Sequence, residues 1–397
     1  MKNTIDASGK THSALSRDLV ILSGCFLFAF MGAGAMQQFL VTNIAEKTGK
    51  SDAQCSWILA MVYFAGVFWR IYSAHTIRFL GMYKAVVLGL CTYTFFMLCV
   101  VLFSNYWLLL IAAFIWGWGA AAVWITSPTQ LLQTTSSKRY GLASGIFYSS
   151  VFIGQGAGVM ILGSLSPNQK FQQVLLIAVA ISLVGNVISL FLPKRQISRE
   201  NPPKITNVFG ALKTVKSWEF VFIQIAASFG FGLLLGSFGT FAKDLGKPDM
   251  VHWITISFYI ARLLASWVVG GLSDWMGRDK VLRYMFLGAA IGLGVAVFSK
   301  SLAALSIAAA MLGLQSGTVP TVITAMVGDS TDEHRRHLAF AALSLLPNFG
   351  VGFTIVGGQY LRLLLGGFSR TFIIYASIFS LCALLTIDIG RRAEEKL

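Results

Sequence analysis

Long runs of apolar residues alternate with short polar segments along the whole chain. A helix that crosses about 30 Å of hydrocarbon needs about 20 apolar residues. Twelve stretches meet this requirement and predict membrane helices centred near Phe30, Ala65, Thr94, Trp118, Phe152, Ser182, Gly230, Arg262, Gly292, Gln315, Gly352 and Phe379. The alternating pattern of membrane β-strands does not occur, so we expect an all-α integral membrane protein.

Composition supports the membrane assignment. The 397 residues are 56% hydrophobic and only 12% charged, and the mean hydropathy is +0.71. So few polar residues cannot cover the surface of a water-soluble protein of this length. The lipid bilayer is therefore the first partner that the sequence predicts.

A loop sequence occurs twice, each time between two apolar runs. GGLSDWMGRDK, at residues 270–280, has a weaker copy in AHTIRFLGMYK, at residues 74–84. Gly81 and Gly277 are separated by the same number of residues as Lys84 and Lys280. We interpret the chain as one six-helix module used twice, with pseudo-symmetric halves at residues 1–193 and 217–397. The long polar segment between them, residues 194–216, is predicted to be a cytoplasmic linker.

The distribution of basic residues predicts the orientation. Most of the Lys and Arg residues fall in the segments that share a side with both termini, which the positive-inside rule assigns to the cytoplasm. In a bacterium the membrane would be the inner membrane. The net charge of +15 is spread over short loops, so we read it as contact with anionic lipid headgroups and expect no nucleic-acid partner.

Several kinds of chemistry have no support in the sequence. The five cysteines lack paired spacing, and we predict neither disulfides nor a metal site. No Gly-rich loop ends in Lys and Ser or Thr, which argues against direct use of ATP. We expect no cofactor and no enzymatic activity, because no nucleophile lies beside a base and no carboxylate pair lies within an apolar run.

The loop after the eighth stretch carries a known family pattern. Gly270, Leu272, Asp274, Gly277 and Arg278 satisfy G-x-L-x-D-x-x-G-R in order. With its twelve spans and central basic loop, the chain resembles the major facilitator superfamily of secondary transporters. The resemblance implies that Gly270, Asp274, Gly277 and Arg278, with Gly81 of the first copy, form a conformational latch. The first copy departs from the pattern, with Ala74 at the leading glycine and Arg78 at the acidic position.

Two other segments resemble narrower groups of this superfamily. The fifth stretch has Gly145, Gly154, Gly158 and Gly163 spaced as in the antiporter signature, but Val159 replaces its proline. Close helix packing is the alternative use of these glycines. GAGAMQQFL at residues 32–40 and GIFYSSVFIGQGAGV at residues 145–159 are similar to the Unc-ninety-three-like branch, which implies a non-transporting chaperone or ion-channel regulator as an alternative function.

Charged groups inside the bilayer are costly and are kept mostly for function. Three arginines lie within apolar runs: Arg262 at the centre of the eighth, Arg70 nearer the cytoplasm in the second, and Arg362 near the outer end of the eleventh. Arg362 is expected to reach the outer interface with its side chain. Arg70 could be structural or functional. For Arg262 we favour an anionic substrate over backbone carbonyls of an unwound helix.

Polar and aromatic residues near these arginines complete the predicted binding site. Tyr259 lies on the same face of its helix as Arg262, and Tyr63 on the same face as Arg70. The family resemblance implies a cavity lined by the first, fourth, seventh and tenth helices. The substrate-binding residues predicted in this way are Arg262, Arg70, Tyr259, Tyr63, Gln37, Gln38, Trp124, Gln224 and Gln315. Interhelical hydrogen bonding is the alternative role of each glutamine.

The sequence thus favours a monomeric secondary transporter, an antiporter or facilitator, for a small organic anion. Alternating access would move the substrate without ATP. The alternative is the non-transporting membrane chaperone or channel regulator.

Overall fold

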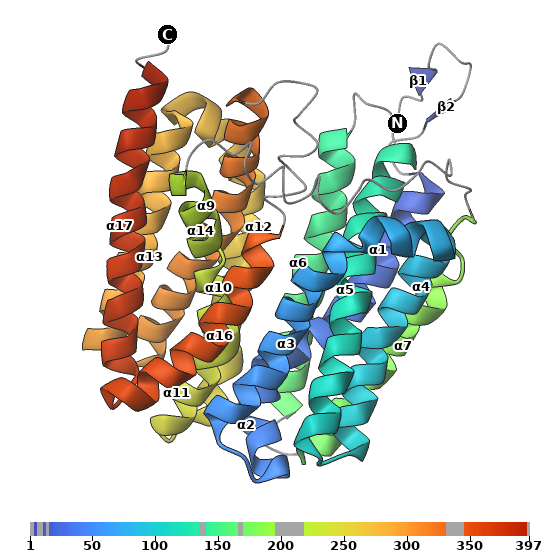
Figure 1. Cartoon of the computed structure of the whole chain (residues 1–397), viewed down its shortest axis with the longest axis horizontal. Coiled ribbons are helices and arrows are strands. Elements are labelled where there is room, and N and C mark those ends of the chain that lie inside the picture. Colours follow the sequence, from blue (N-terminus) through green and yellow to red (C-terminus); the bar gives the residue numbers. More distant parts are fainter. Residues whose placement is uncertain are drawn as a thin grey trace. The chain divides into compact units, whose positions relative to one another are not determined.

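The computed structural model describes residues 4–5, 11–12, 16–134, 140–165, 170–194, 218–330 and 345–394 (Figure 1). Nearly all of these residues are helical. The rest are loops and turns and a short antiparallel ribbon of β1 (Thr4–Ile5) and β2 (Thr11–His12), in which Thr4 pairs with His12. The predicted linker at residues 194–216 lies almost wholly outside the described part of the chain.

The first half of the sequence forms six long helical segments. Their elements are α1 (Arg17–Ala29), η1 (Phe30–Gly34), α2 (Ala35–Thr48), α3 (Asp52–Ile71), α4 (Ser73–Leu102), α5 (Tyr106–Thr134), α6 (Tyr140–Leu165) and α7 (Phe171–Ser189). The segment from α1 to α2 is one continuous helix with a π-helical turn, η1, in its middle.

The second half repeats this pattern. Its elements are α9 (Trp218–Ala226), α10 (Phe229–Leu233), η3 (Leu234–Phe238), α11 (Gly239–Asp244), η4 (Pro248–Met250), α12 (Val251–Met276), α13 (Arg278–Phe298), α14 (Leu302–Ser330), α16 (Leu346–Leu365) and α17 (Phe368–Glu394). A π-helical turn, η3, again interrupts the first long segment, which runs from α9 to α11. Both halves therefore carry a π-helical turn in their first membrane segment.

Eleven of the described segments are long and apolar enough to cross a membrane. The twelfth, α16, has 20 residues but is less apolar, because it includes Pro347, Asn348, Gln359 and Arg362. The prediction of an all-α membrane protein with twelve membrane helices is confirmed.

The chain divides into two compact units that do not follow the predicted domain boundaries. Unit 1 consists of residues 1–36 and 68–202, and unit 2 of residues 37–67 and 203–397. The hairpin formed by α2 and α3 therefore belongs mostly to unit 2. A cluster of apolar side chains joins it to η3 and α16, made of Val41, Leu59, Ala60, Leu235, Val351 and Ile355. The halves at residues 1–193 and 217–397 stay a prediction.

Each π-helical turn has a side chain from another helix bonded to its backbone. In unit 1, the Ala33 amide of η1 donates to Ser182 Oγ of α7 over 3.0 Å. In unit 2, Gln359 Nε2 of α16 donates to the Gly236 carbonyl of η3 and to Thr240 Oγ1. Inside a membrane such groups need a partner within the protein, and side chains of neighbouring helices provide it here. These bonds place α7 against η1 and α16 against η3.

Gly81 and Gly277 occupy corresponding turns of the repeated loop. Gly81 has φ 74° and ψ 164° within a kink of α4, and Gly277 has φ 91° and ψ 137° between α12 and α13. Side chains other than glycine rarely adopt such positive φ values. The shared conformation explains why glycine is kept at both positions although the rest of the first copy has diverged.

Glycines of α6 allow a close approach to α1 and η1 within unit 1. A methyl group added at Gly158 would overlap the Met31 carbonyl oxygen, and one at Gly154 the Leu27 carbonyl oxygen. These glycines therefore serve close helix packing, which was one of the two uses that the sequence left open.

The packing at α6 gives the first test. Gly158→Ala should destabilise the protein by about 1–3 kcal/mol, because backbone rather than a flexible side chain must move. Gly145→Ala in the same helix is the matched control: nothing lies within 4 Å of the added methyl group, and alanine favours helix. Thermal unfolding in detergent measures both. Equal melting temperatures for the two variants would contradict the described packing of α6.

Candidate functional site

Arg262 lies at the middle of α12, and aromatic rings surround its guanidinium group. The guanidinium carbon is 4.9 Å from the centre of the Phe231 ring and 6.0 Å from that of Phe258. The side chains of Tyr259 and Tyr63 also lie near Arg262. Cation–π contacts of this kind stabilise a charge that has left water. Residues of α3, α10 and α12 together thus surround Arg262 at the middle of its helix.

Two consecutive glutamines of α2 fix the two tyrosines. Gln38 Nε2 donates to Tyr259 Oη over 2.9 Å, and Tyr63 Oη donates to Gln37 Oε1 over 2.6 Å. Gln37, Gln38 and Tyr259 are buried. We call this group the Arg262 site; its residues, all in unit 2, are Gln37, Gln38, Tyr63, Phe231, Phe258, Tyr259 and Arg262.

The other two glutamines predicted to bind substrate have different surroundings. Gln315 of α14 is fully buried and donates to the Ala227 carbonyl over 3.0 Å. Ala227 lies where the helix breaks between α9 and α10, so Gln315 satisfies a backbone group that the break leaves open. Gln224 of α9 is also buried, and its Oε1 makes no hydrogen bond to any residue that the structure describes. A role of Gln224 in substrate binding stays a prediction.

Arg70 and Trp124 belong to unit 1, in a second aromatic cluster. The side chains of Tyr93 of α4 and Tyr148 of α6 lie near Arg70. Trp124 of α5 stacks on Tyr148 with ring centres 6.2 Å apart, and its ring is 5.5 Å from that of Phe30. Both predicted residues thus lie in one cluster. Tyr63, which the sequence paired with Arg70, instead lies in the Arg262 site.

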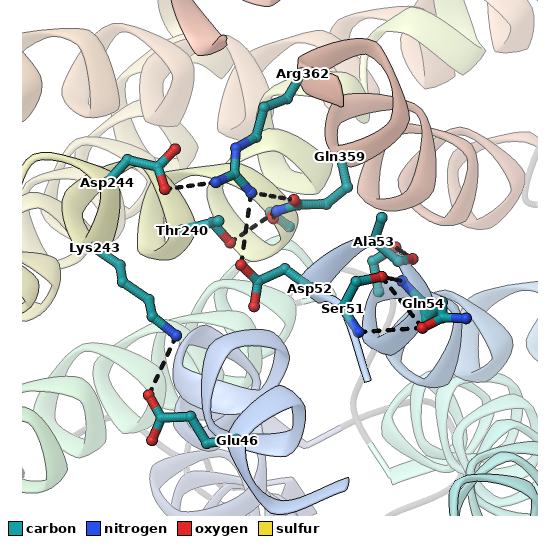
Figure 2. Close-up of polar contacts among 12 residues, drawn as sticks. Glu46, Ser51, Asp52, Ala53, Gln54, Thr240, Lys243, Asp244, Gln359 and Arg362 are labelled. Carbon is teal, nitrogen blue, oxygen red and sulfur yellow. Dashed lines mark hydrogen bonds and ion pairs between the residues drawn. The ribbon is translucent and has the colours of Figure 1, made fainter. Parts of the chain in front are cut away.

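A network of charged residues lies at the end of unit 2 where α2, α11 and α16 end (Figures 1 and 2). Arg362 of α16 donates to Asp244 of α11 and to Gln359 Oε1, over 3.3 Å in the second case. Its Nη1 is also 3.6 Å from Asp52 at the start of α3. We call these four residues the Arg362 network. Lys243 pairs separately with Glu46 of α2 over 3.2 Å.

The sequence interpretation of Arg362 did not include its ion-pair partners. Only 20% of its side chain is exposed, and two carboxylates bind it. Its position at the membrane interface stays a prediction. The acids were missed because Asp52 and Asp244 lie at helix ends far from Arg362 in sequence. Among the residues that the structure describes, no group of three or more His, Cys, Asp or Glu could hold a metal ion.

The sequence profile of the Major Facilitator Superfamily matches residues 22–223 and, a second time, residues 220–396. The two matches cover nearly the whole chain and give each half its own copy. The chain belongs to the Major Facilitator Superfamily. Membership confirms the resemblance and makes the protein a membrane transporter; the narrower similarity to the Unc-ninety-three-like branch stays a prediction.

Relatives of this major facilitator include the uncharacterized MFS-type transporter YcaD of Escherichia coli. The chain is 25% identical to YcaD of strain UMN026 over 281 residues, which cover 70% of this chain and 71% of the relative. It is 24% identical to YcaD of strain HS over the same length. Among solved structures, a mutant of the nucleoside transporter NupG matches with a TM-score of 0.76 and 12% identity, covering 93% of this chain and 99% of NupG. The likeness to NupG shows the shared fold.

The latch motif of this major facilitator is described only in part. Gly277 forms the turn between α12 and α13, and Arg278 begins α13. Gly81 forms the corresponding kink in α4. Gly270 and Asp274 lie in α12, but their side chains are outside the described part. The latch role of these five residues stays a prediction.

Sequence reasoning missed the aromatic residues around both arginines. Phe231 and Phe258 lie at the Arg262 site, and Tyr93 and Tyr148 lie near Arg70. The chain has 31 Phe and 11 Tyr, so one more ring in an apolar run carries no signal. Phe258 could have been found, because it lies four residues before Arg262 on the same helix face.

The bond between Gln38 and Tyr259 gives the second test. Gln38→Leu and Tyr259→Phe should each destabilise the protein, and the double variant should lose less than the sum, with a coupling of about 0.6–2 kcal/mol. Thermal unfolding in detergent measures the four members of the cycle. Gln54→Leu with Tyr259→Phe is the control pair, since Gln54 is exposed and its side chain accepts from the Ser51 amide of its own turn. Strict additivity for Gln38 and Tyr259 would show that the described bond is not formed.

Proposed function

We propose that this protein is a secondary transporter of a small organic anion and that Arg262 binds the negative group. One observation carries the proposal: a guanidinium group at the middle of a membrane helix, held among aromatic rings and two oriented tyrosines. Placing a charge at this depth costs about 3 kcal/mol or more, so such residues usually serve transport or signalling. A carboxylate, phosphate or sulfonate matches the planar fork of guanidinium.

The surroundings of Arg262 suit an organic anion rather than a small inorganic one. Phe231 and Phe258 offer apolar ring surface beside the charge, and Tyr63 and Tyr259 offer hydroxyl groups at fixed positions. An organic anion can use both kinds of surface at once. Gln37 and Gln38 contribute by holding the tyrosines, and Gln224 contributes a buried amide.

Transport would proceed by alternating access, with movement of the halves at residues 1–193 and 217–397 around the substrate. Both termini and the linker at residues 194–216 would be cytoplasmic, and the protein would act as a monomer by exchange or facilitated diffusion. The family membership, and the π-helical turn in the first membrane segment of each half, support this scheme. Arg70 and Trp124 would contact the substrate from unit 1, Arg70 more during release than during binding.

Transport itself can be tested without knowing the substrate. The purified protein is first screened for thermal stabilisation by organic anions, organic cations and neutral solutes of similar size. Proteoliposomes are then loaded with an anionic hit, and exchange with the labelled compound outside is followed. We expect stabilisation by anions and saturable exchange. Stabilisation only by cations or neutral solutes would overturn the anionic substrate, and binding without any flux would favour a regulator over a transporter.

The role of Arg262 predicts that lysine cannot replace it. Arg262→Lys should weaken binding of the anionic hit nearly as much as Arg262→Ala, by about 1.5–3 kcal/mol or about ten- to a hundredfold. An ammonium group is a strongly hydrated point charge and does not reproduce the fork. Titration in detergent measures the affinity. Arg370→Ala is the matched control, because Arg370, at the start of α17, is exposed and donates to the Leu365 carbonyl at the end of α16.

A second measurement separates binding from stability. If Arg262→Ala kept full affinity while melting several degrees lower, Arg262 would have a structural role. The anionic substrate would then have to be abandoned.

A further inference from the structure

The hairpin of α2 and α3 is held against the rest of unit 2 by a row of contacts. Trp57 Nε1 of α3 donates to Tyr360 Oη of α16 over 3.3 Å, and the rings of Phe64 and Phe349 lie 5.9 Å apart. The apolar cluster that includes Val41 and Leu59 lies in the same contact region, between the hairpin of α2 and α3 on one side and η3, α11 and α16 on the other. We call this contact region the seam. Toward the helix ends the contacts become ionic, with Glu46 bound to Lys243 and Asp52 bound to Arg362 (Figure 2).

The two terminal nitrogens of the Arg362 guanidinium group contact different carboxylates. Nη2 donates to Asp244 Oδ1 at direct hydrogen-bond distance, whereas Nη1 is 3.6 Å from Asp52 Oδ2, too far for a strong hydrogen bond. Gln359 Oε1 accepts from Nη1 over 3.3 Å, and the guanidinium carbon lies 5.0 Å from the Phe368 ring. Asp244, Gln359 and Phe368 thus hold Arg362 from its own half of the sequence, and Asp52 is its weaker partner from the first half.

We propose that Asp52 and Asp244 compete for Arg362, and that this competition sets how readily the hairpin separates from α11 and α16. Contact with Asp52 favours the closed seam. Contact with Asp244 keeps the guanidinium group paired when Asp52 moves away. Separation of the hairpin therefore does not leave a partly buried charge without a partner. Asp244 therefore favours opening, although it lies in the same network as Asp52.

This arrangement differs from a simple ion-pair lock, in which every carboxylate of the network would hold the seam closed. Competition predicts effects of opposite sign for two isosteric substitutions. Asp52→Asn removes the closing partner and should raise the population of the open seam. Asp244→Asn removes the competitor, leaves Arg362 to Asp52 and should lower that population.

The inference rests on the proposed function in one respect: separation of the hairpin is taken to be a step of alternating access. The test itself needs no substrate. Val41 is 4% exposed within the seam, so a Val41→Cys variant reports separation through its rate of alkylation by a water-soluble maleimide. Cys91, the exposed native cysteine, is replaced by serine throughout. The same protein without Val41→Cys gives the background from the four buried cysteines.

We expect alkylation of Val41→Cys to become about threefold faster with Asp52→Asn and about threefold slower with Asp244→Asn, as suits partly exposed ion pairs. Lys243→Gln is the matched control. It neighbours Asp244, but its pair with Glu46 is 40% and 70% exposed, and such pairs contribute little. Its labelling rate should stay within about 1.5-fold of the parent. Melting temperatures are measured in parallel.

Exchanging the charges of Arg362 and Asp52 distinguishes loss of the ion pair from misfolding of a variant. Arg362→Asp should increase labelling because three carboxylates then face one another, and adding Asp52→Arg to that variant should restore protection. Changes of the same sign for Asp52→Asn and Asp244→Asn, or no rescue by the exchange, would overturn the competition. Opposite signs together with no anion flux in proteoliposomes would leave the competition standing and refute the proposed transport instead.

Discussion

A backbone group that leaves the helical ladder inside a membrane has no water to bond, and this constraint organises the protein. The first membrane segment of each half has such openings, at η1 and at η3, and the segment from α9 to α11 has another at its break. Ser182, Gln315 and Gln359 bond the exposed groups at these places. The three side chains come from α7, α14 and α16, so the same bonds determine which helices pack against each interrupted segment.

The π-helical turns η1 and η3 also lie close to the residues that position Arg262 and Arg362. Gln359 bonds η3 with its amide nitrogen and accepts from Arg362 with its amide oxygen, so the position of Arg362 depends on the π-helical turn. At the other site, Gln37 and Gln38 follow η1 by about one turn of α2 and bond to Tyr63 and Tyr259. A change at η3 would therefore reach Arg362 through Gln359. A change at η1 would reach the tyrosines beside Arg262 through Gln37 and Gln38. π-Helical turns are often found at functional sites, and here the neighbouring contacts give a physical reason.

Sequence reasoning succeeded where the signal was local. Apolar runs predicted the membrane helices, including α16, and the motif around Gly277 predicted the family. It failed where a residue's partner is remote in sequence. Arg362 was given no partner, because Asp52 and Asp244 could not be seen to converge on it. Tyr63 was placed with Arg70 from their spacing on one helix, whereas the unit boundary near Phe68 separates them.

The sequence by itself determined that this chain lies in a membrane, that it has twelve helices, that it belongs to its family and that Arg262 carries a charge at mid-helix. These follow from hydropathy, helix length and short motifs, which need no knowledge of neighbours. Only the tertiary structure decided which rings enclose Arg262, that Gln315 and Gln359 bond backbone, and that Arg362 is shared by two acids. The reason is that burial and pairing are set by contacts between helices, and one helix's sequence does not specify the face that another presents to it.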